Sequence, residues 1–232
     1  MRLTLGLLGG ASPAATLNFL EKLQSYTPVK SDADHIRVIA DINPGVPDSN
    51  TPGAGAGPLL AEMAGALRGA GADVLAIVSN AAHAHADLVQ RASRLPLIDM
   101  IGTAAAAARA SGVRRVGVLG AKASLRLYRE YLAAQAMGMV NLQGDPQIDF
   151  LALLQRIRDG DLGAEVQSGM AALAAELVAD GAEVVIAGSA SLSLVLRPEE
   201  VRVELIDPAD HLARRCVAVA LGAEPVPQVP AS

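Results

Sequence analysis

The chain has 232 residues, of which 51% are hydrophobic and 19% are charged, and its formal net charge is −5. This length suits one large domain or two of roughly 100 residues, and the apolar content is enough for a sizeable core. The acidic balance without a basic stripe argues against a nucleic-acid partner, and the single cysteine, Cys216, excludes an internal disulfide and a cysteine-based metal site.

The first half alternates strand and helix patterns. Residues 3–8 predict a strand, Gly9-Gly10 a turn, and residues 13–24 a helix that begins after Ser12 as its cap. The apolar start is too short for a signal peptide, and no run reaches the roughly 20 apolar residues of a membrane helix, so we expect a cytoplasmic protein. Further strands are predicted at 35–41, 73–78 and 97–98, helices at 59–70, 83–93 and 104–110, and a Pro- and Gly-rich loop at 43–58.

The second half repeats this alternation. It predicts strands at 115–119, 183–187 and 202–206, helices at 124–137, 150–159, 165–180 and 209–221, and a loose tail at 222–232. Strands that alternate with helices form parallel sheets covered on both faces. The predicted fold class is therefore α/β, with two similar Rossmann-like lobes.

Three patches recur in the same order at nearly one spacing. GLLGG at 6–10 matches GVLGA at 117–121, GADV at 71–74 matches GAEV at 181–184, and LID at 97–99 matches LID at 205–207. We interpret this as a duplication with pseudo-twofold related lobes: residues 1–104 completed by a C-terminal helix at 209–222, and residues 105–208. The alternative is two unrelated lobes with similar strand chemistry.

Ser79 and Ser189 each follow a buried apolar run directly. Ligands of open α/β sheets bind just beyond the carboxyl ends of the strands. If the lobes face each other, the two serines flank one cleft from opposite sides. Such an arrangement suits chemistry that needs one group on each face of a flat intermediate.

Several motifs occur in order along the chain: GLLGG at 6–10 followed by Ser12, NPGVPD at 43–48, SNAAH at 79–83, VGVLG at 116–120, and AGS at 187–189 ahead of LID at 205–207. In this combination the sequence resembles the aspartate/glutamate racemase family over nearly its whole length. The resemblance implies a cofactor-independent amino-acid racemase, in which two cysteines, one from each lobe, flank the α-carbon of the substrate. One thiolate removes the α-proton and the other thiol delivers a proton to the opposite face.

This sequence departs from the family pattern where that chemistry lies. Ser79 and Ser189 occupy the two cysteine positions, and alanines follow them at 81 and 190 in place of threonines. Ala121 replaces the threonine after the strand at 115–119, and Ser49 replaces the arginine of the loop at 43–58. The lysine that precedes a glycine in the family corresponds to Arg158.

A serine hydroxyl is less acidic than a thiol by several pKa units, each worth about 1.4 kcal/mol, so a catalytic serine needs a separate base. His83, four residues after Ser79, is the nearest candidate; the alternative is that His83 binds the loop or the substrate. Two functions follow. One is an amino-acid racemase that uses Ser79 and Ser189 with weak or altered activity, and the other is a non-catalytic relative that binds a small carboxylate.

The resemblance and the strand-end positions together give a set of candidate residues. Ser79, Ser189 and His83 are the catalytic candidates, and the substrate-binding candidates are Gly9, Gly10, Ser12, Asn43, Asn80, Ala81, Arg158, Gly188 and Ala190. We expect a small carboxylic acid or amino acid as partner, no cofactor, and no metal, because the four histidines lack metal-site spacing. Cys216 is expected to be a buried core residue, and a homodimer is left open.

Overall fold

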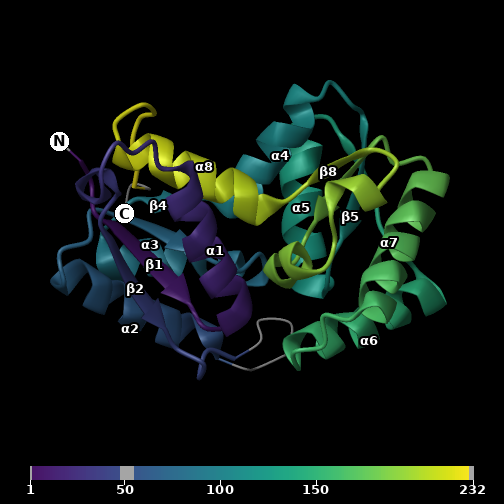
Figure 1. Cartoon of the computed structure of the whole chain (residues 1–232), viewed down its shortest axis with the longest axis horizontal. Helices are drawn as coiled ribbons and strands as arrows, with labels where there is room; N and C mark the ends of the chain where they lie inside the picture. Colours follow the sequence, from purple (N-terminus) through teal and green to yellow (C-terminus); the bar gives the residue numbers. More distant parts are fainter. Residues whose placement is uncertain (1, 48–54, 230–232) are drawn as a thin grey trace. The chain divides into compact units, whose positions relative to one another are not determined.

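The computed structural model describes residues 2–47 and 55–229, and the chain divides into two compact units. Residues 1–100 and 209–232 form the first unit, and residues 101–208 form the second. Each unit holds one sheet of four parallel strands (Figure 1). The predicted fold class, two parallel-sheet α/β lobes, is confirmed.

The sheet of the first unit has the order β2-β1-β3-β4. Helices α2 and α3 pack on the face that presents Leu8, Leu75 and Ile77, while α1 and α8 lie together on the other face (Figure 1). The strands are β1 (Leu5–Gly9), β2 (Val38–Ile42), β3 (Val74–Ile77) and β4 (Leu97–Ile98), and the helices are α1 (Pro13–Tyr26), α2 (Ala56–Gly69), α3 (Ala86–Ser93) and α8 (Pro208–Ala220).

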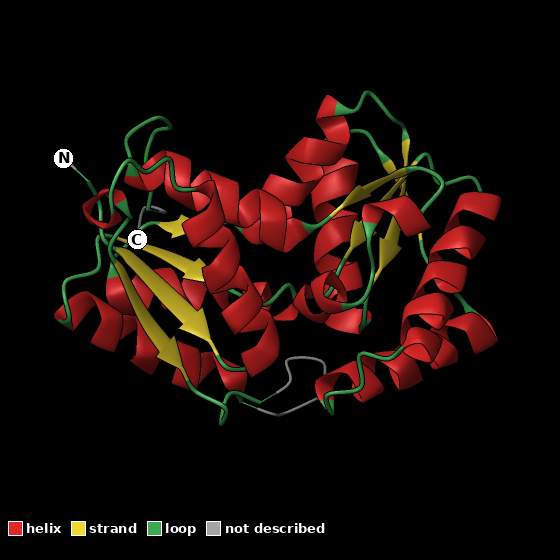
Figure 2. Ribbon diagram, in the orientation of Figure 1, coloured by secondary structure: helices red, strands yellow, loops and turns green. Residues whose placement is uncertain are grey.

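The sheet of the second unit has the equivalent order β6-β5-β7-β8, again with helices on both faces (Figure 2). Helices α4 and α5 pack on the face of Val118 and Ile186, and α6 and α7 on the face of Leu119 and Val185. The strands are β5 (Arg115–Leu119), β6 (Gly138–Val140), β7 (Val184–Ala187) and β8 (Glu204–Ile206), and the helices are α4 (Met100–Ala110), α5 (Lys122–Ala134), α6 (Gly144–Arg158) and α7 (Ala164–Ala179).

The sequence repeat reappears as equal strand register. Leu5 pairs with Val74 in the first sheet, and Val116 pairs with Val184 in the second, which are the partners that the repeat places opposite each other. The edge strands agree too, since Leu75 pairs with Leu97 and Val185 pairs with Leu205.

A carboxylate at the start of each third strand is also repeated. Asp73 accepts a hydrogen bond from the backbone N–H of Thr4 at 2.8 Å. At the equivalent place, Glu183 accepts one from Arg115 at 2.7 Å. Hydrogen bonds from the backbone of Arg114 and Arg115 hold the pKa of Glu183 below its ordinary value.

One helix of each unit comes from the other half of the sequence. Helix α4 follows β4 along the chain, yet Ile101, Ala104 and Ala105 are buried in the core of the second unit. Conversely, α8 follows β8 but belongs to the first unit, where Ala220 accepts a hydrogen bond from the backbone N–H of Leu3 at 2.9 Å. The first stretch of the chain therefore ends at residue 100 rather than at the expected 104.

Short elements account for most differences from the predicted secondary structure. The predicted helix at 83–93 is divided into a 3-10 helix, η2 (Ala81–His85), and α3, and β6 was not predicted. Two further 3-10 helices are η1 (Asp32–Asp34) and η4 (Pro198–Glu200), and η3 (Ala190–Leu194) follows β7 as η2 follows β3. No helix in the described part of the chain is long and apolar enough to cross a membrane.

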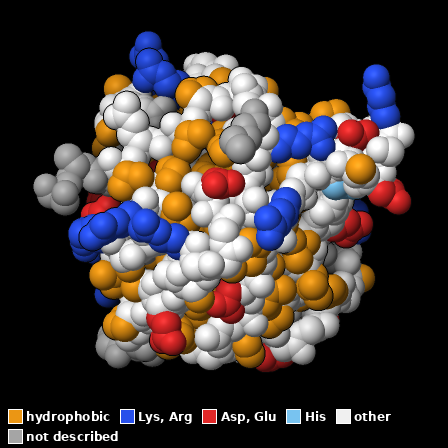
Figure 3. All heavy atoms as spheres, turned by 90° about the vertical axis from the view of Figure 1, so that its left-hand side faces the viewer, with side chains coloured by type: hydrophobic (Ala, Val, Ile, Leu, Met, Phe, Trp, Pro, Cys, Tyr) orange, Lys and Arg blue, Asp and Glu red, His pale blue; other side chains and the backbone are white. Residues whose placement is uncertain are grey.

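The side of the first unit seen in Figure 3 carries basic, acidic and apolar side chains interspersed with one another. Its described residues form no continuous basic surface in this view.

Candidate functional site

The carboxyl ends of parallel strands meet at one edge of a sheet, so the loops after them lie close together in each unit. We name residues 9–12, 43–45, 79–83 and 99–100 the first loop cluster, and residues 120–122, 188–193 and 207 the second loop cluster. Each cluster is built within its own unit. Except for Arg158, all the predicted site residues belong to these two clusters.

The glycine turn after β1 is fixed by its neighbours. Gly10 has a φ of +113°, which side chains other than hydrogen rarely permit, and a Cβ there would overlap the backbone of Asn43. Its N–H donates to Oγ1 of Thr16 at 3.4 Å, and that hydroxyl donates to the carbonyl of Ser12 at 3.0 Å. Ser12 also caps α1, because its Oγ accepts from the N–H of Ala15 at 3.4 Å.

Asn43 uses its side-chain oxygen to hold the turn after β2. This oxygen accepts a hydrogen bond from the backbone N–H of Gly45 at 2.9 Å. The backbone N–H of Asn43 donates to the carbonyl of Gly9 at 3.3 Å, and this hydrogen bond joins the turns after β1 and β2. Ser49, the expected substitute for the loop arginine, lies outside the described residues.

Ser79 is the half-buried member of the loop after β3, and Asn80, Ala81 and His83 behind it are buried. Its Oγ accepts a hydrogen bond from the backbone N–H of Ala82 at 3.3 Å. The hydroxyl therefore helps to start η2. Among the described residues, no hydrogen bond joins this hydroxyl to a carboxylate or an imidazole.

His83 uses both ring nitrogens within the first unit. Nδ1 lies 2.8 Å from the backbone carbonyl of Ser79, which can only accept, and Nε2 accepts from the backbone N–H of Met100 at 3.1 Å. This pattern fixes the neutral tautomer that carries its proton on Nδ1. With both nitrogens engaged, the ring offers no lone pair to the hydroxyl of Ser79. The geometry favours the alternative reading, in which His83 binds the loop.

The second loop cluster repeats the first around Ser189. Ser189 is half-buried and Gly188 and Ala190 are buried, in the same pattern that Ser79 and its neighbours show. A Cβ on Gly188 would lie 2.8 Å from the carbonyl of Leu119 and 3.4 Å from the ring of Tyr128. Glycine is therefore needed where β7 leaves the sheet.

Ser193 and Asp207 form a contact that the sequence analysis missed. The Oγ of Ser193, in η3, donates to Oδ1 of Asp207, directly after β8, at 2.8 Å. In the first unit, the equivalent positions are His83 and Asp99, whose Nε2 and Oδ1 lie 3.8 Å apart. The signal was present in the repeat, which aligns the two LID segments and also aligns position 83 with position 193.

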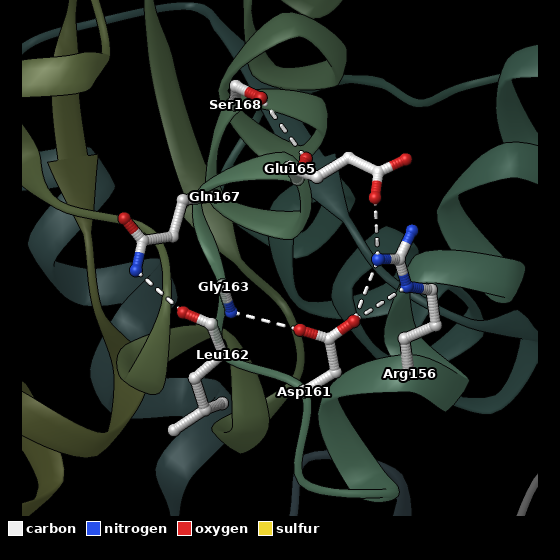
Figure 4. Close-up of polar contacts among 7 residues, drawn as sticks. All are labelled: Arg156, Asp161, Leu162, Gly163, Glu165, Gln167 and Ser168. Carbon is white, nitrogen blue, oxygen red and sulfur yellow. Dashed lines mark hydrogen bonds and ion pairs between the residues drawn. The ribbon is translucent and has the colours of Figure 1, made fainter.

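Arg158 is exposed at the last position of α6. The neighbouring Arg156 forms the charge network at this corner, with contacts of 2.7 Å to Asp161 and 2.8 Å to Glu165 (Figure 4). These carboxylates raise the pKa of Arg156 through their hydrogen bonds, and Arg156 in turn holds the pKa of Glu165 below its ordinary value. The role of Arg158 in binding stays a prediction.

Cys216 lies fully buried in α8, away from both loop clusters in the sequence. Burial raises the pKa of its thiol, so the thiol stays protonated at neutral pH. Within residues 2–47 and 55–229, no group of three potential metal ligands is present.

Comparison with known proteins places this fold. The sequence matches the Asp/Glu/Hydantoin racemase family over residues 8–216. Aspartate racemase of Picrophilus torridus is similar in structure, with a TM-score of 0.82, 19% identity, and coverage of 94% of both chains.

Two further solved structures share the fold. An aspartate racemase homologue from Pyrococcus horikoshii has a TM-score of 0.78 and 24% identity, over 95% of this chain and 100% of its own. A liganded double mutant of arylmalonate decarboxylase has a TM-score of 0.61 and 17% identity, over 98% and 96%. At these identities, the likeness establishes the fold alone.

Proposed function

We propose that this chain, which belongs to the Asp/Glu/Hydantoin racemase family, binds a small carboxylic acid or amino acid at its strand-end loops and does not racemise aspartate or glutamate at a rate typical of enzymes. The observation that carries the proposal is the pairing of intact loops with absent proton-transfer groups. Both loops are held by backbone contacts, whereas each family cysteine position holds a serine hydroxyl, and in the described residues the hydroxyl of Ser79 has no hydrogen bond to an imidazole.

The binding half of the proposal rests on the loops themselves. Glycines at 10 and 188 let the turns after β1 and β7 pack more closely than a Cβ would allow, and backbone N–H groups at strand ends are the ordinary donors for a carboxylate. The side chains at 81, 121 and 190 are small alanines, which leave room beside the two serines. We infer that a small carboxylate binds beside these alanines.

The chemical half rests on acidity. Without a base, a serine hydroxyl is a poor acceptor for an α-proton, because the alkoxide it must supply is scarce at neutral pH. His83 is the only histidine in the first loop cluster, and its two nitrogens already bind Ser79 and Met100. No histidine lies in the second loop cluster.

A cofactor-independent racemase that uses the serines is the second candidate. The observation in its favour is the equal placement of Ser79 and Ser189: each follows the third strand of its sheet, precedes a 3-10 helix and is half-buried. A racemase needs one group for each face of the α-carbon, and the repeat supplies one serine per unit.

Thermal unfolding with added acids tests the binding proposal. Monocarboxylates, dicarboxylates, aspartate and glutamate are each added at 10 mM. An acid present at 100 times its Kd stabilises the fold by about 2.7 kcal/mol, which raises the Tm by about 5–10 °C.

A matched pair of variants locates the binding. Ser189→Leu fills the second loop cluster and should abolish the shift, whereas Ser168→Leu, on the exposed surface of α7, should leave it intact. If no acid stabilises the wild type, or if both variants behave alike, the proposed site is wrong. Rapid loss of the α-proton of aspartate in D₂O, abolished by Ser79→Ala, would instead establish the second candidate.

A further inference from the structure

Each reactive serine precedes a 3-10 helix that is tied to the end of the edge strand. In the first unit, His83 of η2 accepts from the N–H of Met100 at 3.1 Å, just after β4. In the second unit, Ser193 of η3 donates to Asp207 at 2.8 Å, just after β8. The two ties use different side chains at equivalent positions of the repeat.

These ties lie where regular structure is weakest. Strand β4 has only two residues and β8 only three, so few ladder hydrogen bonds hold the chain there. Directly after them, at residues 100–101 and 208–209, the chain passes from one compact unit to the other. A side-chain bond at that point fixes both the serine loop and the end of the edge strand.

Burial and charge differ between the two ties. The side chain of His83 is only 2% exposed, and it satisfies one donor and one acceptor of the backbone. Ser193 is half-buried and donates to a carboxylate, which makes a stronger bond than one between neutral groups. Both bonds are short enough to restrain the loop.

We propose that His83 and Ser193 are equivalent positioning residues, each of which holds the serine loop of its own unit against the end of the edge strand. His83 orients Ser79, and Ser193 orients Ser189. The biological use of this arrangement rests on the proposed function of these loops. The positioning itself can be measured without any ligand.

A thiol reporter provides this measurement. Ser79→Cys or Ser189→Cys is introduced into the full chain, and the rate of reaction with a disulfide reagent such as 5,5′-dithiobis(2-nitrobenzoate) is followed from pH 6.5 to 9. The native Cys216 stays silent because it is fully buried and its pKa is raised. The reporter rate then measures how tightly the loop is held.

Each tie should act only on its own unit. Ser193→Ala should raise the rate at position 189 by about tenfold, because a hydrogen bond to a carboxylate is lost, and should change the rate at position 79 by less than about twofold. His83→Asn, which keeps a donor for the carbonyl of Ser79 but loses the acceptor for Met100, should do the reverse. Ser193→Thr, in contrast to Ser193→Ala, keeps a hydroxyl at this position and should keep the slow reaction of the thiol at position 189.

Ser111→Ala is the matched control. It removes a hydrogen bond to Glu204, at the opposite end of the same strand β8, and should leave both reporters unchanged. Unaltered rates in Ser193→Ala and His83→Asn, or equal rises at both reporters, would overturn the proposal. So would a rise in Ser111→Ala as large as that in Ser193→Ala. Absence of carboxylate binding would contradict the proposed function and leave this result standing.

Discussion

Restoring two thiols should switch on proton exchange in this fold. The change is the double variant Ser79→Cys/Ser189→Cys. A thiol of ordinary pKa, about 8.5, is ionised to a few per cent at pH 7. The pKa of a serine hydroxyl is higher by about four units, which corresponds to about 5.5 kcal/mol, or about 10⁴ in rate. In the wild-type structure His83 supplies no base, since both of its ring nitrogens are engaged, and the N–H of Ala82, at 3.3 Å, is a single weak donor to Oγ of Ser79. We therefore expect a gain of at least about 10³ in the rate of α-proton exchange with an acid that binds.

The assay is proton NMR in D₂O, which follows the α-proton of L-aspartate, L-glutamate and any acid that raises the Tm. The matched control is Ser79→Ala/Ser189→Ala, which removes the hydroxyls and adds no thiol. We expect this control and the wild type to stay at the solution background. A wild-type rate within about tenfold of that of the thiol variant would show that the serines suffice, and a thiol variant with no exchange on a bound acid would show that the loops do not hold the α-carbon beside these positions.

Three smaller predictions concern stability and ligand charge. Burial opposes ionisation of Asp210, but hydrogen bonds from Tyr26 and Arg214 outweigh it and lower the pKa below 3.8, so its stabilising effect is present above about pH 4 and is lost on acidification. Asp210→Asn should cost about 1–3 kcal/mol at pH 7 in urea unfolding, and the gap to the wild type should close toward pH 3; a pH-independent gap would contradict the assignment. Ala136, just after α5, has a φ of +59°, so Ala136→Gly should raise the free energy of unfolding by about 0.5–1 kcal/mol in the same assay. Ala133→Gly, inside the helix, should lower it by about 1 kcal/mol, and a lower free energy in both variants would refute the strain argument. Because Arg158 is exposed, Arg158→Ala should weaken the binding of a dicarboxylate by less than about 1 kcal/mol in titration calorimetry. A larger loss of binding free energy for the dicarboxylate, with none for a monocarboxylate, would place this arginine in a buried ion pair.

The strand cores could be predicted because buried parallel strands are continuous apolar runs. Ser79 and Ser189 stand just after the apolar runs of β3 and β7, so the sequence predicted where these two strands end. The strand register agrees with the repeat, since Leu97 and Leu205 meet equivalent partners in their sheets. The three-residue β6 was not predicted.

The sequence assigned each linking helix to a unit, but it did not determine at which residue the first unit ends. Helix α4 is alanine-rich and nearly uniform around its surface, so its apolar pattern indicates burial but no particular partner. Only the packed structure places Ile101 and Ala104 in the core of the second unit.

The role of His83 shows the same division at the level of one side chain. The sequence put an imidazole four residues after Ser79, which is compatible with a base and with a loop contact. The structure adds a contact that favours the loop role, because the backbone N–H of Met100, 17 residues further along, donates to the second ring nitrogen. The local sequence pattern determines where strands end, because burial and backbone geometry act over a few residues. The partner of a polar side chain depends on contacts that the chain makes only when it folds, and such contacts leave no periodic pattern in the sequence.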